Sequence, residues 1–106
     1  MIARRWRGWV ATDRAEEYVD YLDATGLSEY KETPGNLGAY CLMRDLGDGR
    51  TEVQALSFWE SMDAVKRFAG DDPERAVYYP EDDDYLVGER ETTVLHFRVP
   101  WAHRGD

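Results

Sequence analysis

The chain has 106 residues and a net charge of −9 at neutral pH, and it contains four Trp, seven Tyr and three Phe. This length predicts a single domain, and the negative charge disfavours nucleic acid and anionic membranes as partners. The lone cysteine, Cys41, allows no disulfide within the chain, and no apolar stretch approaches the roughly 18 residues that span a membrane, so we expect a cytoplasmic protein.

The chain begins with a predicted strand and helix. Residues 2–11 are rich in Ile, Trp and Val, and strand alternation divides them into two faces. One face carries Ile2, Arg4, Trp6, Gly8 and Val10, and the other carries Ala3, Arg5, Arg7 and Trp9. Thr12 or Asp13 then caps a helix, with Glu16 completing a capping box. Helical spacing predicts the buried stripe of this helix, which is Ala15, Tyr18, Val19 and Leu22.

A further helical turn and a hairpin follow. Gly26 breaks the helix, and residues 27–32 predict one more turn. Residues 37–46 and 50–59 predict two antiparallel strands, because the Gly-Asp-Gly sequence at residues 47–49 suits the positive φ angles of a hairpin turn.

The segment from Leu56 to Gly70 carries the clearest local signal. An apolar strand ends at Trp59, and a short amphipathic helix begins almost at once. Ser61 is the predicted N-cap of this helix and Gly70 its C′ residue. Four residues share the apolar face of the helix: Met62, Val65, Phe68 and Ala69.

The C-terminal third predicts one more helix and one more strand. Residues 72–78 begin with Asp-Pro-Glu, which is typical of a helix start, and residues 80–87 predict an irregular or helical connection. Residues 92–99 alternate as a strand does. We therefore expect one domain over residues 1–100 and a C-terminal tail over residues 101–106.

The predicted order of elements is βαββαβ. This order is typical of the ferredoxin-like α+β fold, in which a four-stranded antiparallel sheet has helices on one face. Both faces of the first and last predicted strands carry large apolar residues. Since no element remains to cover the second face, we expect a second copy of the chain to do so in a homodimer.

Here the chain resembles the antibiotic biosynthesis monooxygenase family of dimeric α/β-barrel proteins. The resemblance rests on Ser57-Phe58-Trp59-Glu60-Ser61, followed by Ala64 and Phe68, and on the order of elements as far as Val99. It implies that two ferredoxin-like subunits pair as a dimeric barrel. Members include oxygenases that act on polyketide-derived phenols and anthrones with dioxygen and without metal or flavin, as well as haem-degrading enzymes.

The haem-degrading branch of the family is disfavoured by three positions. Its helix Trp falls on Phe68 in this chain, its haem-ligating His falls on about Tyr78, and the first strand has no Asn. Tyr can ligate haem iron, so Tyr78 or Tyr79 leaves a weak case for haem.

The candidate catalytic residues are one histidine and two arginines. His96 lies in the last predicted strand, and an imidazole with a pKa near neutrality is a suitable base for a phenolic or enolic proton. Arg7 or Arg98 could stabilise the anion that forms. The alternatives are a structural histidine and a solvated, charge-balanced sheet edge.

Aromatic side chains are the candidate walls of a substrate pocket. Those expected to bind a flat hydrophobic substrate are Trp59, Tyr79, Tyr78, Trp6 and Phe68. Ordinary core packing is the alternative for each of them. The acidic run Glu81–Asp84 lacks the spacing of a calcium loop and predicts a solvated segment, so we expect no metal.

These observations predict a small cytoplasmic homodimer that uses dioxygen, and no cofactor, to oxidise an aromatic or polyketide-like molecule. Two alternatives remain open at this point. The same pocket could belong to a non-catalytic dimer that binds a small hydrophobic molecule, or to an isomerase or cyclase, because a fold alone does not decide function.

Overall fold

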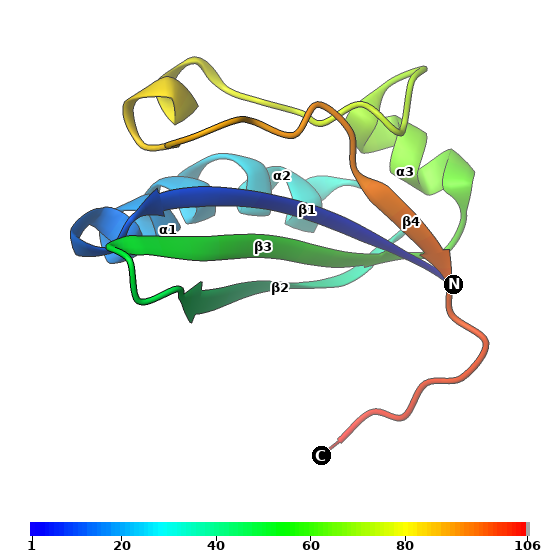
Figure 1. Cartoon of the computed structure of the whole chain (residues 1–106). Coiled ribbons are helices and arrows are strands. Elements are labelled where there is room, and N and C mark those ends of the chain that lie inside the picture. Colours follow the sequence, from blue (N-terminus) through cyan, green and yellow to red (C-terminus); the bar gives the residue numbers. More distant parts are fainter. Residues whose placement is uncertain (106) are drawn as a thin grey trace.

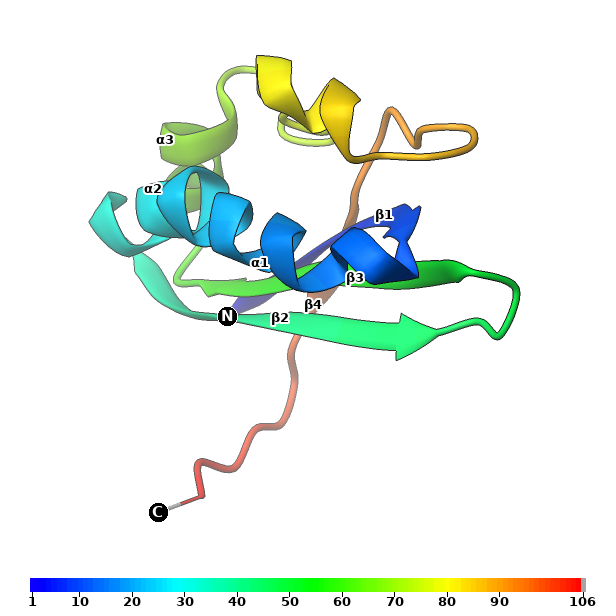
Figure 2. The ribbon, with the colours of Figure 1, turned by 90° about the vertical axis from the view of Figure 1, so that its left-hand side faces the viewer.

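A computed structural model describes residues 1–105 and shows a four-stranded antiparallel sheet with helices on one face (Figures 1 and 2). The strand order is β2-β3-β1-β4. The strands are β1 (Ile2–Ala11), β2 (Asn36–Asp45), β3 (Arg50–Trp59) and β4 (Leu95–Arg98). The helices are α1 (Ala15–Ala24), α2 (Gly26–Glu32) and α3 (Met62–Ala69), with short 3-10 helices η1 (Thr12–Arg14) and η2 (Pro80–Asp84). The predicted ferredoxin-like order is confirmed.

Strand pairing decides which face of β1 meets the helices. Arg4 pairs with Ser57 of β3 and with His96 of β4, and Trp6 pairs with Ala55. Because directly paired residues of antiparallel strands share a face, these side chains lie together on the helix side of the sheet. The opposite side, called the open face below, carries the other set of side chains of the sheet: Ala3, Arg5, Arg7, Trp9, Ala11, Tyr40, Leu42, Arg44, Arg50, Glu52, Gln54, Leu56, Phe58, Leu95 and Phe97.

The predicted caps of α3 are confirmed, and the predicted N-terminal cap of α1 is wrong. The hydroxyl oxygen of Ser61 accepts a hydrogen bond from the Ala64 amide at 3.2 Å, and Gly70 ends the helix with a φ of 86°. Neither Thr12 nor Asp13 caps α1, so the predicted capping box is wrong. The Thr12 hydroxyl is instead 2.9 Å from that of Thr51, a long-range contact that competes with the local one.

The predicted helix over residues 72–78 is wrong, and the predicted last strand over residues 92–99 is shortened. Arg75 forms an isolated bridge with Thr93, and backbone hydrogen bonds join Ala76 to Thr92 and Val94 to Glu74. These hydrogen bonds satisfy backbone N–H and C=O groups of both stretches, so residues 72–78 do not form a helix. The second pairs with β1 only from Leu95 onward.

Residues 71–94, called the cover segment below, cross the helix side of the sheet above β1 (Figure 1). Their backbone is mostly irregular apart from η2. The Val87 amide donates a hydrogen bond to the Trp9 carbonyl at 2.8 Å, and Leu86 bridges Val10. The cover segment is therefore the layer that closes the fold over the N-terminal strand.

The C-terminal end of the described chain leaves the sheet as extended backbone on the side away from the helices (Figure 1). Trp101 in this tail is 79% exposed. Within residues 1–105, no helix is long and apolar enough to cross a membrane.

Candidate functional site

A small cleft lies between the helix side of the sheet, α1, α2, α3 and the cover segment. Its volume is about 30 Å³, close to the space of one water molecule in the liquid. Five aromatic side chains form much of its wall: Trp6, Tyr18, Tyr30, Phe68 and Tyr79. Three of the predicted pocket residues, Trp6, Phe68 and Tyr79, therefore do line one cleft.

Arg4 is the one basic residue that lines this cleft, and it is only 1% exposed. Its Nη2 donates a hydrogen bond to the Arg75 carbonyl at 3.2 Å, and its guanidinium lies 5.4 Å from the centre of the Phe68 ring. Its Nε is buried and has no hydrogen-bond partner, and no carboxylate of residues 1–105 lies within ion-pair distance of Arg4. Burial lowers the pKa of this guanidinium.

His96 is the neighbour of Arg4 on β4, directly opposite it in the strand pairing. Its Nε2 is buried and has no partner in the described chain. Burial lowers the pKa of His96, the positive charge of Arg4 lowers it further, and Glu74 acts in the opposite direction. The imidazole is therefore biased toward its neutral form. His96 lies beside Arg4 and is not part of the cleft wall.

Trp59 lies in the core, outside the predicted wall of the cleft. It is fully buried, and its Nε1 donates a hydrogen bond to the Ser57 hydroxyl at 2.9 Å. Tyr30 packs edge-on against both Trp59 and Phe68, with ring centres 5.8 and 4.6 Å apart. Tyr30 and Phe68 line the cleft, and Trp59 packs behind them.

The two tyrosines predicted to line the pocket, Tyr78 and Tyr79, lie in different environments. Tyr79 lines the cleft, and its hydroxyl donates to a Glu29 carboxylate oxygen at 2.6 Å. The Tyr78 hydroxyl lies outside the cleft wall, where it accepts a hydrogen bond from Trp6 Nε1 at 3.2 Å and donates to the Glu91 carbonyl. Tyr78 therefore anchors the cover segment to β1.

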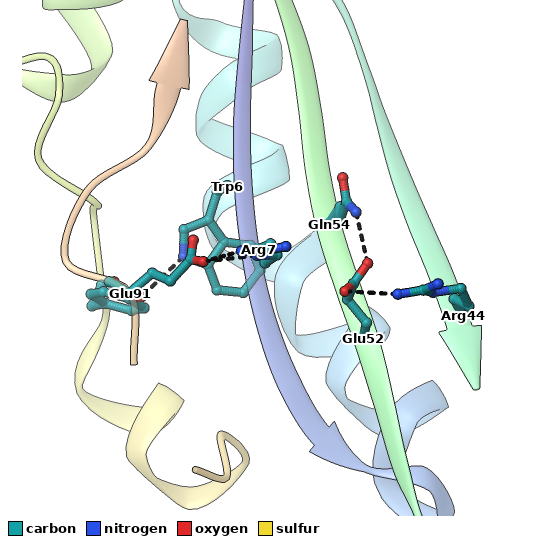
Figure 3. Close-up of polar contacts among 7 residues, drawn as sticks. Trp6, Arg7, Arg44, Glu52, Gln54 and Glu91 are labelled. Carbon is teal, nitrogen blue, oxygen red and sulfur yellow. Dashed lines mark hydrogen bonds and ion pairs between the residues drawn. The ribbon is translucent and has the colours of Figure 1, made fainter. Parts of the chain in front are cut away.

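Neither predicted arginine lines the cleft. Arg7 belongs to the open face because it is an odd number of residues from Arg4, and its Nη2 pairs with a Glu91 carboxylate oxygen at 2.6 Å (Figure 3). Arg98 shares the face of His96 but is exposed at the end of β4. Arg4 is the arginine that sequence reasoning overlooked. The available signal was its position on the same strand face as Trp6.

The open face carries a second polar group of residues (Figure 3). The Glu52 carboxylate accepts a hydrogen bond from Gln54 Nε2 at 2.8 Å and pairs with Arg44 at 3.3 Å. The Gln54 hydrogen bond is the largest cause of a lowered pKa at Glu52. No cluster of three or more metal-ligating side chains occurs in the part of the chain that the structure describes.

No protein-family model and no curated protein matches this sequence. Solved structures do match its fold. A proposed antibiotic biosynthesis monooxygenase from Bacillus cereus aligns with a TM-score of 0.67 at 15% identity, covering 98% of this chain and 97% of that one. A monooxygenase from the ActVA-Orf6 gene of Streptomyces coelicolor, in complex with nanaomycin D, aligns with a TM-score of 0.59 at 17% identity, covering 99% and 92%.

A third structure of the same fold is the haem-degrader MhuD from Mycobacterium tuberculosis with two haems bound. It aligns with a TM-score of 0.57 at 19% identity, covering 98% of this chain and all of the other. At these identities the match establishes architecture. The chain therefore has the fold of the antibiotic biosynthesis monooxygenases and of a haem-degrading protein, as its resemblance to the first family implied.

Proposed function

We propose that this protein is a monooxygenase that oxidises an electron-rich aromatic or polyketide-like molecule with dioxygen, the substrate itself supplying the electrons. The fold is shared with a monooxygenase that was crystallised with nanaomycin D. The observation that carries the proposal is His96, a neutral-biased imidazole with a buried, unpartnered Nε2 beside an aromatic cleft. Such a group is suited to accept a proton from an acidic C–H or O–H group.

The proposed chemistry balances without a further reductant. His96 removes a proton from an activated methylene group, and the carbanion transfers electrons to dioxygen. The methylene carbon becomes a carbonyl, one oxygen atom of dioxygen remains in the product, and the other leaves as water with the two hydrogens. His96 returns its proton to that water.

Substrate entry requires the cleft to widen. Ligand pockets commonly enclose about 300–1,000 Å³, far more than the roughly 30 Å³ present here. Residues 72–79 of the cover segment are the part that we propose to move, because their irregular backbone is joined to β1 by two hydrogen bonds, Arg4–Arg75 and Trp6–Tyr78. Outward movement of these residues would enlarge the space between Trp6, Phe68 and Tyr79 and would uncover His96.

Haem does not fit the residues present. The hydroxyls of Tyr78 and Tyr79 already donate to the Glu91 carbonyl and the Glu29 carboxylate. His96 is a residue of β4 and lies beside the positive charge of Arg4, which opposes the approach of a metal ion. We therefore assign no haem chemistry to this cleft.

The open face supports a proposed homodimer. It exposes large apolar side chains over two strands: Tyr40 at 62%, Leu42 at 45%, Leu95 at 49% and Phe97 at 49%. These residues lie on the two edge strands, β2 and β4. Exposed apolar side chains of this size are typical of an interface, and a second copy of the sheet presents a matching surface. We also propose a cytoplasmic location, because the lone cysteine, Cys41, which is partly buried, allows no disulfide within the chain.

Oxygen consumption tests the proposed activity. Purified, metal-stripped protein is supplied with anthrones and hydroquinones, and His96→Ala is compared with His103→Ala, a matched change in the exposed tail. We expect uptake that requires substrate and falls at least a hundredfold in His96→Ala but not in His103→Ala.

Absence of substrate-dependent uptake across the panel would overturn the oxygenase proposal. Product formation without uptake would instead identify an isomerase or cyclase. Ligand binding without any turnover would identify a binding protein.

A further inference from the structure

The cleft contains a positive charge that no other described residue balances. Arg4 is 99% buried, lines the cleft, and has one buried nitrogen without a hydrogen-bond partner. A buried charge is costly unless a partner of opposite sign and its hydrogen bonds offset the lost hydration. The other charged residue in the wall, Asp82, does not play this part, since it forms no ion pair with Arg4.

The carboxylate of Asp82 is hydrogen-bonded to groups other than Arg4. One of its carboxylate oxygens accepts a hydrogen bond from the Tyr18 hydroxyl at 2.9 Å, and the other accepts one from the Tyr79 amide at 2.8 Å. A negative ligand group is therefore repelled from the Asp82 part of the wall and attracted to the Arg4 part. The charges of the cleft define an orientation for a ligand.

We propose that the cleft binds aromatic anions, with a carboxylate, phenolate or enolate oxygen seated against Arg4. The proposal deepens the proposed function by naming the charge of its substrate class. The cleft that Arg4 lines has a volume of about 30 Å³, the space of one water molecule, so a ligand can enter only when the cleft widens. The ring of the ligand packs on Trp6, Phe68 and Tyr79 when the cover segment moves outward.

The geometry of arginine suits this role. A guanidinium keeps its positive charge and donates strong, charge-assisted N–H hydrogen bonds to negative oxygens. In Arg4 the Nη2 donates to the Arg75 carbonyl, so the Nε–H remains to donate to one oxygen of the ligand. Arg4 is thus a specificity-determining residue that selects a negative oxygen on an otherwise flat, apolar molecule.

Calorimetric titration with 2-naphthoate and 2-naphthamide tests the proposal. The two probes share ring and shape and differ in charge. We expect the wild-type protein to bind naphthoate at least tenfold more tightly than naphthamide, and Arg4→Met to lose that preference. Arg5→Met is the matched control, because Arg5 is the next residue on β1 and lies on the open face.

A third probe, 2-naphthol, separates the two sources of negative oxygen. Its absorption reports ionisation, so a bound phenolate spectrum at neutral pH shows that Arg4 also selects phenolates. An unshifted spectrum restricts the site to carboxylates.

Thermal unfolding adds a measurement that needs no ligand. Removal of an unbalanced buried charge is expected to raise the Tm of Arg4→Met above that of the wild type. Arg5→Met should change the Tm less, because Arg5 is only partly buried, although its Nε also lacks a partner. A lowered Tm in Arg4→Met would show that the contacts of Arg4 with the Arg75 carbonyl and Phe68 outweigh the cost of burying its charge, against the proposal.

Equal affinity for the two probes in the wild-type protein, or no binding of either, overturns the proposal whatever the variants do. Titration is done without turnover, so its failure is distinct from a failure of the oxygenase. A protein that prefers naphthoate but consumes no oxygen would keep the anion site and lose the proposed reaction.

Discussion

Arg4 and His96 influence each other because strand pairing places them side by side. Both burial and the charge of Arg4 disfavour the imidazolium form, and Glu74 offsets part of this effect. A base that must accept a proton near neutral pH benefits from starting in its neutral form. Burial and the pairing of β1 with β4 therefore both favour the neutral form of the proposed base.

The pH dependence of His96 follows from this pairing. We expect kcat/KM to rise through an apparent pKa below about 6.5, the ordinary value for histidine, and then to level off. In the acidic range the unfolded chain binds the His96 proton more readily than the folded one, so the unfolding free energy should fall as the pH drops below about 6.5.

Titration of the His96 ring protons by NMR measures this directly. Arg4→Met should move the midpoint upward, because it removes a positive neighbour, while Arg5→Met should leave it unchanged. A midpoint at or above the ordinary value in the wild type would refute the shift.

The cover segment depends on α1 for its position. Tyr18 of α1 donates a buried hydrogen bond to Asp82 of η2, and the rings of Tyr18, Tyr21 and Tyr85 pack together with their centres 5.3–5.8 Å apart. Asp82 and neighbouring Tyr78 and Tyr79 thus take their places from contacts with helices and β1. These contacts fix η2 on α1, so we expect the cleft to open through residues 72–79, which two hydrogen bonds, Arg4–Arg75 and Trp6–Tyr78, join to β1.

Removal of one hydroxyl tests this attachment. Tyr18→Phe leaves an Asp82 oxygen without its donor in a buried place, so we expect it to lower the unfolding free energy by about 1.5–3 kcal/mol. Tyr21→Phe is the matched control, since the Tyr21 hydroxyl is buried without a partner among residues 1–105 and its loss should be neutral or stabilising. Urea denaturation followed by circular dichroism measures both, and equal losses would contradict the assignment.

The molecule as a whole has one face covered by helices and one open face. The covered face holds the cleft and most of the core. The open face combines exposed apolar side chains with the Arg44–Glu52 and Arg7–Glu91 ion pairs (Figure 3). In an interface with both features, the apolar residues contribute the buried apolar area, and the charged pairs fix how the two subunits align.

A charge placed on the open face should separate the subunits. We expect the wild-type protein to elute with the mass of two chains in light scattering coupled to size-exclusion chromatography, and Phe97→Arg to elute as one chain, because a charge would be buried without a partner. Val87→Arg alters an exposed apolar residue of the cover segment and should remain dimeric. A wild-type monomer at tens of micromolar would overturn the homodimer proposal.

The sequence by itself determined the order of elements, the Ser61 and Gly70 caps of α3 and the two faces of β1. These features depend on residues a few positions apart: alternation in a strand, a hydroxyl near a free amide, a glycine at positive φ. Even Arg4 could have been identified, because strand alternation places it with Trp6.

Tertiary structure decided the rest. Residues 74–76 pair with residues 92–94 in place of the expected helix, because that partner satisfies their backbone hydrogen bonds from far along the chain. The same long-range packing buried Trp59, placed Arg7 on the open face and brought His96 against Arg4. Local patterns specify which faces a strand has, but only pairing between distant strands specifies which face is covered and which side chains meet there.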